Sequence, residues 1–457
     1  MQFAGQRTGM DLQTIGEPVN ITIRLAEDVV PDPDAIMVTG ITPQSTLGGG
    51  ITEAEFLKIF HEEVSIPNTV FIGFNNVRFD DEFMRYLHYR NFYDAYEWQW
   101  QDGRSRWDLL DLIRMTRALR PEGIIWPVDD NGVATNRLEA LTGANDILHE
   151  TAHDALSDVK ASIAVAQLIR AKQPKMFDYL LGICGKKAVK GLVEKGQPFL
   201  YTSGQYSAEW DKTTVVSFLA AHPKKSGSLV YDLRYDPAPY NDMTAVQLAD
   251  TWRYQKDSDK ARLPVKLLQY NRCPALAPLG VLDDDSQKRL SISLETIQDN
   301  LKKLSGSGLS KNILAAVKIL DDERQAVYDN EESDVDAQLY NGFFEYGDKS
   351  KMNLVRTSSA IDMTDLQVDF SDQRLVELLP RYKARNFPQS LTDNERFVWE
   401  KYRYDKLLGG QANSRLANYF NRLAELAKQP GLTTGKRFLL EELQLYGQTI
   451  MPIGDDI

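Results

Sequence analysis

Residues 75–81, Asn-Asn-Val-Arg-Phe-Asp-Asp, combine carboxylates with amide and aromatic side chains at the end of an apolar run. That run is predicted to form a strand, and residues 80–92 are predicted to form a helix. Ligands of α/β sheets collect beyond the carboxyl ends of strands, so Asp80 is well placed to hold a metal ion and Phe79 to pack or stack. The plain alternative is that Asp80 and Asp81 only favour the dipole of the following helix.

Residues 153–158, His-Asp-Ala-Leu-Ser-Asp, could bring an imidazole and a carboxylate together at the start of a helix. Asp154 is a suitable N-cap, which places Asp158 one turn into the helix on the side where His153 lies. Asp158 could then give an oxygen ligand to a hard cation while His153 accepts a proton from water. Alternatively, Asp154 caps the helix and Asp158 lies on a solvated face.

Residues 149–153 also match the H-E-x-x-H pattern of zinc proteases. A zinc-protease interpretation would use His149, Glu150 and His153. It needs a third protein ligand, and the residues before His149 offer no apolar helix to carry the motif. Because a helix is instead expected to begin near His153, we predict that His149 lies on a loop.

The elements that must position these residues alternate between strand and helix over the first third of the chain, which predicts an α/β layer. Strands are expected at 20–27 and 68–75, and helices at 51–64 (with Thr52 as N-cap), 80–92, 105–119 and 153–172.

The pattern changes after Pro174. Short β-branched and aromatic runs separated by turn residues predict a β-rich domain, with strands within 198–204, 213–223, 228–235 and 263–271. The acidic stretch 329–334 is predicted to be a linker. Helical patterns follow at 335–344, 372–387, 395–408, 414–429 and 436–450. We therefore expect three domains, at 1–172, 174–329 and 332–457.

Composition narrows the class of protein. The 457 residues are 42% hydrophobic and 26% charged, which excludes a mainly disordered chain. Two distant cysteines, Cys184 and Cys273, exclude a zinc ribbon and a disulfide scaffold, and they suit a reducing cytoplasm. No apolar run is long enough to span a membrane, and no secretory signal is evident. A net charge of −12 argues against a protein that coats nucleic acid, although it permits a local basic groove.

Taken together, N-N-x-x-F-D and the later H-D-A-x-x-D resemble the DEDD family of 3′→5′ exonucleases, in the branch with a histidine base. Further stretches are similar to bacterial exodeoxyribonuclease I. They include TGITPQ (39–44), YRNFYD (89–94), SRWDLLD (105–111), ALRPEGI (118–124), NRLEALT (136–142), VDAQLYNGFF (335–344) and RYKARNFP (381–388).

This resemblance implies an α/β, ribonuclease-H-like exonuclease domain, then a small β-rich, barrel-like domain and a helical C-terminal domain. It implies two Mg²⁺ ions held by four carboxylates, with His153 as the base and Asp80 and Asp158 among the metal ligands. Arg137, Ile41 and Phe79 correspond to residues that contact the substrate.

The resemblance also implies a function and partners. The expected activity is 3′→5′ degradation of single-stranded DNA to 5′-mononucleotides, in DNA repair and recombination, by a monomer. The expected partners are single-stranded DNA and the acidic C-terminal tail of the single-stranded-DNA-binding protein, to which Arg120 could contribute. Basic and aromatic residues in 381–388 and 266–272 are candidates for a groove that holds the strand, although aromatics in such stretches more often pack in a core.

One motif departs from the family pattern. The family carries Asp-x-Glu on its first strand, which would precede Met1, and the nearest candidate, Asp11-Leu12-Gln13, has Gln in place of Glu. We expect the natural protein to carry an additional N-terminal strand with this motif. Without it, we expect an open sheet edge and little nuclease activity, which leaves a single-strand-binding relic as the alternative function.

The alternatives predict different mutational results. The zinc-protease interpretation predicts that His149→Ala abolishes function. The nuclease interpretation predicts that His149→Ala is nearly silent, whereas His153→Ala and Asp158→Ala are not.

Overall fold

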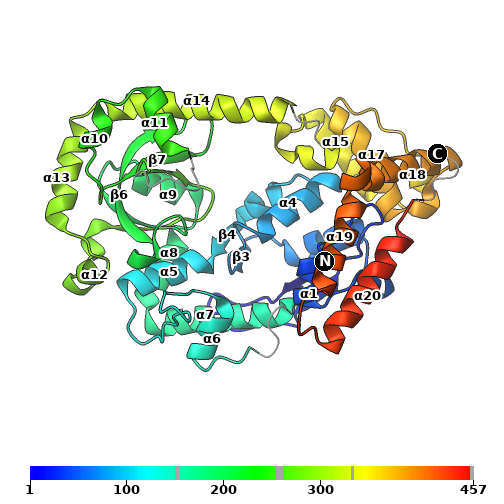
Figure 1. Cartoon of the computed structure of the whole chain (residues 1–457), viewed down its shortest axis with the longest axis horizontal. Coiled ribbons are helices and arrows are strands. Elements are labelled where there is room, and N and C mark those ends of the chain that lie inside the picture. The colour runs from blue at the N-terminus through cyan, green and yellow to red at the C-terminus, as the bar shows by residue number, and fades with distance from the viewer. Residues whose placement is uncertain (150–153, 254–261, 331–333, 453–457) are drawn as a thin grey trace.

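The computed structural model describes residues 1–149, 154–253, 262–330 and 334–452. These residues form three parts that are consecutive in sequence, an α/β part, a β-rich part and a helical part. In Figure 1 the α/β part lies between the β-rich part on the left and the helical part on the right. Within the part of the chain that the structure describes, no helix combines the length and the apolarity needed to span a bilayer.

The first part alternates strands and helices, as the sequence predicts. Its elements are β1 (Gln2–Gly5), β2 (Val19–Thr22), α1 (Pro33–Thr39), α2 (Pro43–Gly49), α3 (Glu53–Ile59), the π-helical η1 (Phe60–Val64), β3 (Val70–Gly73), α4 (Asp80–Arg90), η2 (Glu97–Gln99), η3 (Gln101–Gly103), β4 (Ser105–Asp108), α5 (Leu109–Leu119), α6 (Leu138–Ala144) and α7 (Ala155–Lys172). Thr52 caps α3 in a reciprocal capping box with Glu55, which confirms the predicted start of that helix.

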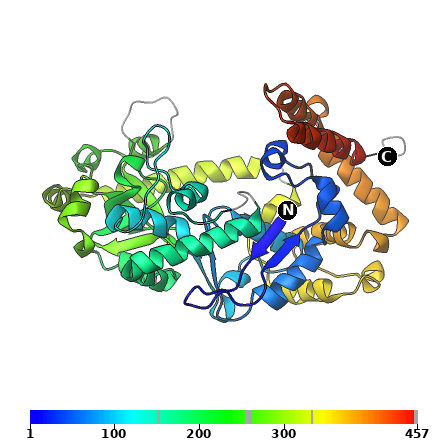
Figure 2. The same cartoon turned by 90° about the horizontal axis from the view of Figure 1, so that it is seen from below.

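The strands of this part form two separate pairs among the described residues. β1 and β2 are antiparallel, and β3 and β4 are parallel. α7 packs along β1, as the view turned by 90° also shows (Figure 2).

The expectation of a single helix over 105–119 is wrong at its start. Residues 105–108 form β4, and the helix begins only at Leu109. Asp108 ends the strand and caps the helix, because its side chain accepts a hydrogen bond from the backbone N–H of Leu110. Arg106 and Trp107 are buried on the strand, so pairing with β3 decided the conformation here.

The second part is built on one five-stranded antiparallel sheet in the order β8-β7-β6-β5-β9. Its elements are α8 (Pro174–Gly182), α9 (Lys186–Val193), β5 (Phe199–Thr202), η4 (Ala208–Trp210), β6 (Thr213–Ala221), β7 (Gly227–Asp232), α10 (Ala238–Asn241), α11 (Ala245–Trp252), β8 (Val265–Gln269), β9 (Ala275–Pro278), η5 (Leu279–Val281), α12 (Asp284–Arg289), α13 (Leu294–Ser305) and α14 (Leu309–Asn330). The four predicted strands are confirmed.

The third part is helical, and the long helix α14 leads from the sheet domain towards it (Figure 1). Its elements are η6 (Val335–Asn341), α15 (Tyr346–Thr357), α16 (Asp362–Asp365), α17 (Gln373–Asn386), η7 (Pro388–Ser390), α18 (Asp393–Leu408), η8 (Gln411–Asn413), α19 (Arg415–Ala427) and α20 (Thr434–Thr449). The linker expected at 329–334 is wrong in part, because Asp329 and Asn330 belong to α14. Residues 331–333 lie outside the described residues.

The hydrophobic cores cross from one part to the next. Side chains of α5 and α7 share a core with β6, β7 and α14 of the second part. Tyr89 and Phe92, at the end of α4, share another core with η6, α15 and α17 of the third part. Such shared burial ties the first part to both of its neighbours, so the elements that carry the candidate site residues have fixed positions.

Candidate active site

Asp80 begins α4, just beyond the carboxyl end of β3. The connecting loop turns sharply at Asn75, which has a left-handed φ of 63°. The backbone N–H of Asn75 donates a hydrogen bond of 2.9 Å to Oδ1 of Asp108, at the end of the neighbouring strand β4. Desolvation by the surrounding protein raises the pKa of Asp80 above its ordinary value. A bound cation would offset this cost.

The two acidic residues at this helix start play different roles. Asp81 is almost fully buried and pairs with Arg106 and Arg85, so it holds α4 against β4. Asp80 remains exposed at the surface. Phe79 is exposed as well, with its ring against that of Phe83 one turn on.

Asp158 lies one turn into α7, as predicted. Asp154 is the N-cap of this helix, and its side chain accepts a hydrogen bond from the backbone N–H of Ser157. Gln2 of β1 fixes the same helix start, because Nε2 of Gln2 donates to Oδ1 of Asp154 over 3.1 Å and Oε1 of Gln2 accepts from the backbone N–H of Ala155. These hydrogen bonds fix the start of α7 and with it the position of Asp158.

His149 lies on the loop before α7, as predicted, and its side chain reaches Asp158. Nε2 of His149 is 2.8 Å from Oδ1 of Asp158, and Nδ1 faces Oγ1 of Thr142 at 3.4 Å. No local pattern predicts this contact, because a loop residue and a helix residue nine positions apart meet only through the fold. His153 and Glu150 lie outside the described residues.

Two of the three residues expected to contact the substrate lie on different loops, and the third, Phe79, precedes α4. Ile41 is in the turn between α1 and α2, and Arg137 is exposed as the residue before α6. Among the described residues, no hydrogen bond or ion pair joins Ile41 or Arg137 to Asp80 or Asp158.

The carboxylates of the described residues do not form a group of three or more that could enclose a metal ion. Asp80 and Asp158 each offer carboxylate oxygens, and one oxygen of Asp158 is already hydrogen-bonded to His149. Such a sparse donor set fits Mg²⁺ that keeps several waters and also binds a substrate phosphate. Asp11, in a turn after β1, is exposed, and its Oδ1 accepts from the backbone N–H of Gln13.

The basic stretch 381–388 does not form an exposed groove. Arg385 is buried against Asp28 and Asp336, and Lys383 is buried against Glu395. Tyr382 lies in the core. The expectation that these residues hold a nucleic acid is wrong, because carboxylates from distant segments neutralise the cations inside the protein.

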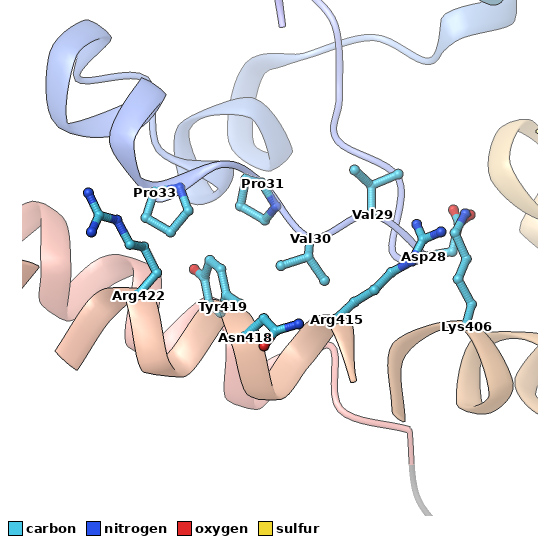
Figure 3. A pocket seen from close by; sticks show the side chains of 10 residues that line it. All are labelled: Asp28, Val29, Val30, Pro31, Pro33, Lys406, Arg415, Asn418, Tyr419 and Arg422. Carbon is cyan, nitrogen blue, oxygen red and sulfur yellow. The ribbon is translucent and has the colours of Figure 1, made fainter. Parts of the chain in front are cut away.

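The same network reaches a pocket of about 390 Å³ between residues 28–33 and the helices α18 and α19. Figure 3 shows Lys406 reaching towards Asp28 at one end of this pocket, with Arg422 near Pro33 at the other. Lys406 is bound to Asp28 and Arg422 to Asp34. These cations are therefore engaged in joining the first part to the third.

Sequence reasoning missed two acids that hold the Asp80 loop. Asp108 binds the backbone of Asn75, and Asp111 forms a 2.9 Å ion pair with Arg78. Asp108 is the last residue of β4 and Asp111 lies in the first turn of α5, within a stretch that is predicted from sequence to be a single helix. Recognising SRWD as a strand that ends in a helix cap would have placed them at this edge.

The fold and this site define a multidomain nuclease. Three family models match the chain consecutively, described as Exonuclease (residues 1–166), Exonuclease I SH3-like domain (185–317) and Exonuclease I C-terminal domain (333–450). Exodeoxyribonuclease I of Haemophilus influenzae is 41% identical over 454 residues, which cover 98% of this chain and 94% of that protein.

Solved structures agree with this class. The exonuclease I of Methylocaldum szegediense is 40% identical, with a TM-score of 0.92 over 98% of this chain and 95% of that chain. E. coli exonuclease I in complex with a dA16 oligonucleotide is 38% identical, with a TM-score of 0.90 and the same coverage. An ExoI/SSB-Ct complex superimposes with a TM-score of 0.89 at 37% identity, again over 98% and 95% of the two chains.

This chain belongs to the exodeoxyribonuclease I family. The implied fold class is confirmed, with an exonuclease domain, an SH3-like β domain and a helical C-terminal domain. Family membership also decides in favour of a phosphodiester hydrolase over a zinc protease.

Proposed function

We propose that this protein hydrolyses single-stranded DNA from its 3′ end and releases 5′-mononucleotides. The carrying observation is the family match over 98% of the chain, combined with Asp80 at the end of β3 and Asp158 at the start of α7. The dA16 strand bound by the E. coli relative supports a single-stranded substrate. We propose, from the same resemblance, that it acts in DNA repair and recombination in the cytoplasm.

The proposed roles of the site residues are those that the family resemblance implies, and they suit the chemistry of the side chains. Asp80 and Asp158 hold Mg²⁺, which when bound supplies charge for the scissile phosphate and acidity for a coordinated water. His153 accepts the proton of that water. Ile41 and Phe79 lie against the terminal base, and Arg137 binds the substrate backbone, where a guanidinium matches phosphate geometry.

A second candidate function is binding of single strands without cleavage. It is favoured by the absence, among the described residues, of a group of three metal-binding side chains. On this alternative, the printed 457 residues hold DNA but turn it over slowly or not at all.

We also propose that a monomer of this protein docks the acidic tail of the single-stranded-DNA-binding protein, as the ExoI/SSB-Ct complex suggests. Arg120, between α5 and Pro121, is a candidate contact for that tail. Its guanidinium donates to the backbone carbonyl of Val281 and pairs with Asp283 at 3.1 Å, so it is held at the junction of the first two parts.

One experiment separates the two functions. A single strand labelled at its 3′ end is incubated with the protein in Mg²⁺ and in EDTA, and fluorescence anisotropy measures binding in EDTA. Hydrolysis predicts labelled mononucleotides in Mg²⁺ and a loss of about 100-fold or more in rate for Asp80→Asn and Asp158→Asn. Asp299→Asn on α13, whose carboxylate is exposed, serves as the matched control.

Binding without any product in Mg²⁺ or Mn²⁺ supports the second function. Product formation that survives both active-site substitutions would overturn the assignment of Asp80 and Asp158.

A further inference from the structure

A second pocket, of about 400 Å³, lies where the first part of the chain meets α15 of the third part. His61, Ser65, Tyr93 and Arg104 line it from the first part, and Arg356 lines it from α15. Its volume falls in the range of about 300–1,000 Å³ that is typical of sites for small molecules. The pocket therefore has room for a ligand that touches both parts.

This pocket is separate from the candidate active site. Ser65 and Arg104 come before the parallel strands β3 and β4 in the chain, whereas Asp80 and Asp108 lie at the carboxyl ends of the same two strands. A ligand in this pocket would thus lie away from the carboxylates that are proposed to bind Mg²⁺.

Two buried polar atoms of the pocket have no hydrogen-bond partner among the described residues, Nε of Arg104 and Oγ of Ser65. The side chain of Arg104 is only 8% exposed, and Ser65 is 2% exposed. The other nitrogens of Arg104 are engaged, since Nη1 donates to the backbone carbonyl of Ser65 and Nη2 pairs with Asp102 at 3.3 Å. Because a buried donor without a partner is costly, Nε of Arg104 is a candidate contact for an acceptor on a ligand.

Arg356 forms no ion pair with a carboxylate within the described part of the chain. Its guanidinium donates to the backbone carbonyl of Phe92 over 2.9 Å and lies over the ring of Tyr93, 4.8 Å from the ring centroid. Desolvation lowers the pKa of Arg356 despite the opposing effects of Tyr93 and Glu97, so the burial of this cation is not fully compensated. A bound anion would supply the missing charge.

The carboxylates that line the pocket are already engaged by cations. Nζ of Lys349 lies 2.7 Å from Asp94 and 3.2 Å from Glu97. Asp102 pairs with Arg104, but its side chain is more than half exposed, so water screens this ion pair. These acids therefore leave the unpartnered Nε of Arg104 available to a ligand.

His61 lies where the electrostatic field of the pocket is positive. Burial lowers the pKa of this histidine to about 4, and the charges of Arg356 and Arg104 contribute to the shift. The ring is therefore neutral near pH 7, and it stacks on the ring of Tyr93 at 4.5 Å between centroids. This side of the pocket suits an anion rather than a cation.

We propose that this pocket binds a phosphate-type oxyanion, either inorganic phosphate or the phosphate group of a mononucleotide, through Arg104, Arg356 and Ser65. A tetrahedral oxyanion offers several acceptor oxygens in different directions, which suits two guanidinium groups and a hydroxyl on separate segments. Because Arg104 belongs to the first part and Arg356 to the third, the bound anion holds the two parts together. This inference does not depend on the proposed function.

Binding of inorganic phosphate by the full chain tests this site. Isothermal titration calorimetry in EDTA at constant ionic strength should detect binding, and the melting temperature should rise with phosphate concentration, because the ligand binds only the folded protein. Arg104→Gln and Arg356→Gln should each weaken the affinity by about ten-fold or more, since each removes a charged donor. Arg324→Gln on α14, where the guanidinium is exposed, is the matched control and should bind phosphate normally.

Titration with dTMP distinguishes the two sources of the phosphate group. If dTMP binds more tightly than phosphate and loses affinity in the same two variants, the natural ligand is a nucleotide; equal affinities indicate that the phosphate group alone is recognised. Asp80→Asn should bind both ligands as wild-type protein does. Arg356→Lys keeps the charge in the pocket and should retain part of the affinity, which gives a second test if Arg356→Gln does not fold.

Equal affinity in wild-type protein and in both glutamine variants would show that anions bind nonspecifically, which overturns the site. The site is also overturned if wild-type protein binds neither phosphate nor dTMP. A loss of binding confined to Asp80→Asn would place the anion at the active site and would overturn the proposal as well. Each of these results would leave the proposed function in place, because hydrolysis of DNA is measured separately.

Discussion

Nε2 of His149 lies 2.8 Å from Oδ1 of Asp158. The His149 side chain is only 7% exposed, whereas that of Asp158 is 40% exposed, so a buried ring holds one oxygen of a carboxylate whose other side faces solvent. This arrangement resembles the outer hydrogen bonds that orient metal-binding carboxylates.

His149→Ala should lower the rate of hydrolysis by about ten-fold or more and raise the Mg²⁺ concentration needed for half-maximal rate, because Asp158 loses its orienting partner. This revises the expectation from sequence that the substitution is nearly silent. His149→Gln, whose amide can still donate, should recover part of the loss. Leu148→Ala, at an exposed neighbour, is the control. An unchanged Mg²⁺ dependence in His149→Ala would show that the contact does not matter for metal binding.

Asp108→Ala should slow hydrolysis as well as destabilise the protein. It removes the acceptor for the backbone N–H groups of both Asn75 and Leu110, each at 2.9 Å, and so frees the loop that carries Asp80. We expect a loss of about 1–2 kcal/mol in the free energy of unfolding, typical of a lost N-cap, and a fall in kcat. Urea unfolding and steady-state kinetics measure the two effects. Thr244→Ala, which removes the N-cap of α11, is the control. It should lower the free energy of unfolding by a similar amount and leave kcat unchanged.

The stability of the protein should fall in acid through Asp28. Burial would raise the pKa of this carboxyl, but Arg385 and Lys406 outweigh it and lower the pKa to about 2. A folded-state pKa below the ordinary value of 3.8 means that the stabilisation is complete above that value and is lost as the pH falls towards 2. Ionised Asp28 contributes about 2 kcal/mol to the free energy of unfolding.

Asp28→Asn should therefore unfold at lower denaturant concentration at pH 6 and show a flatter loss of stability between pH 5 and pH 2.5. Denaturant titrations at several pH values check this. Asp34→Asn is the control, because its partner Arg422 is exposed and the pair should contribute little. If the free energy of unfolding changed with pH equally in wild type and Asp28→Asn, the loss of stability in acid would not come from Asp28.

Arg120→Ala should weaken binding of a peptide with an acidic, apolar carboxyl terminus while leaving degradation of free single strands unchanged. The expected loss is about ten-fold at low salt and smaller at high salt, because charge attraction at a part-exposed guanidinium is screened. Peptide anisotropy measures it. Arg437→Ala on α20 should bind the peptide normally, and an equal loss in both variants would indicate nonspecific attraction.

Local spacing in the sequence determined the helix starts and the candidate acids. Thr52 and Asp154 cap helices where predicted, because capping depends on residues three positions apart. Local spacing also predicts that Asp80 lies at a strand end and that Asp158 lies one turn into a helix. The resemblance in motifs was enough to indicate the family.

Only the tertiary structure decided which charged side chains are exposed and which are paired inside the protein. The local sequence around Arg385 predicts a DNA contact, but in the structure Arg385 is paired with Asp28, which is distant in the chain. His149 gained its partner, and residues 105–108 became a strand, through neighbours that local patterns do not specify. The reason is physical: local spacing fixes the face on which a side chain lies, whereas burial and pairing depend on what packs against that face.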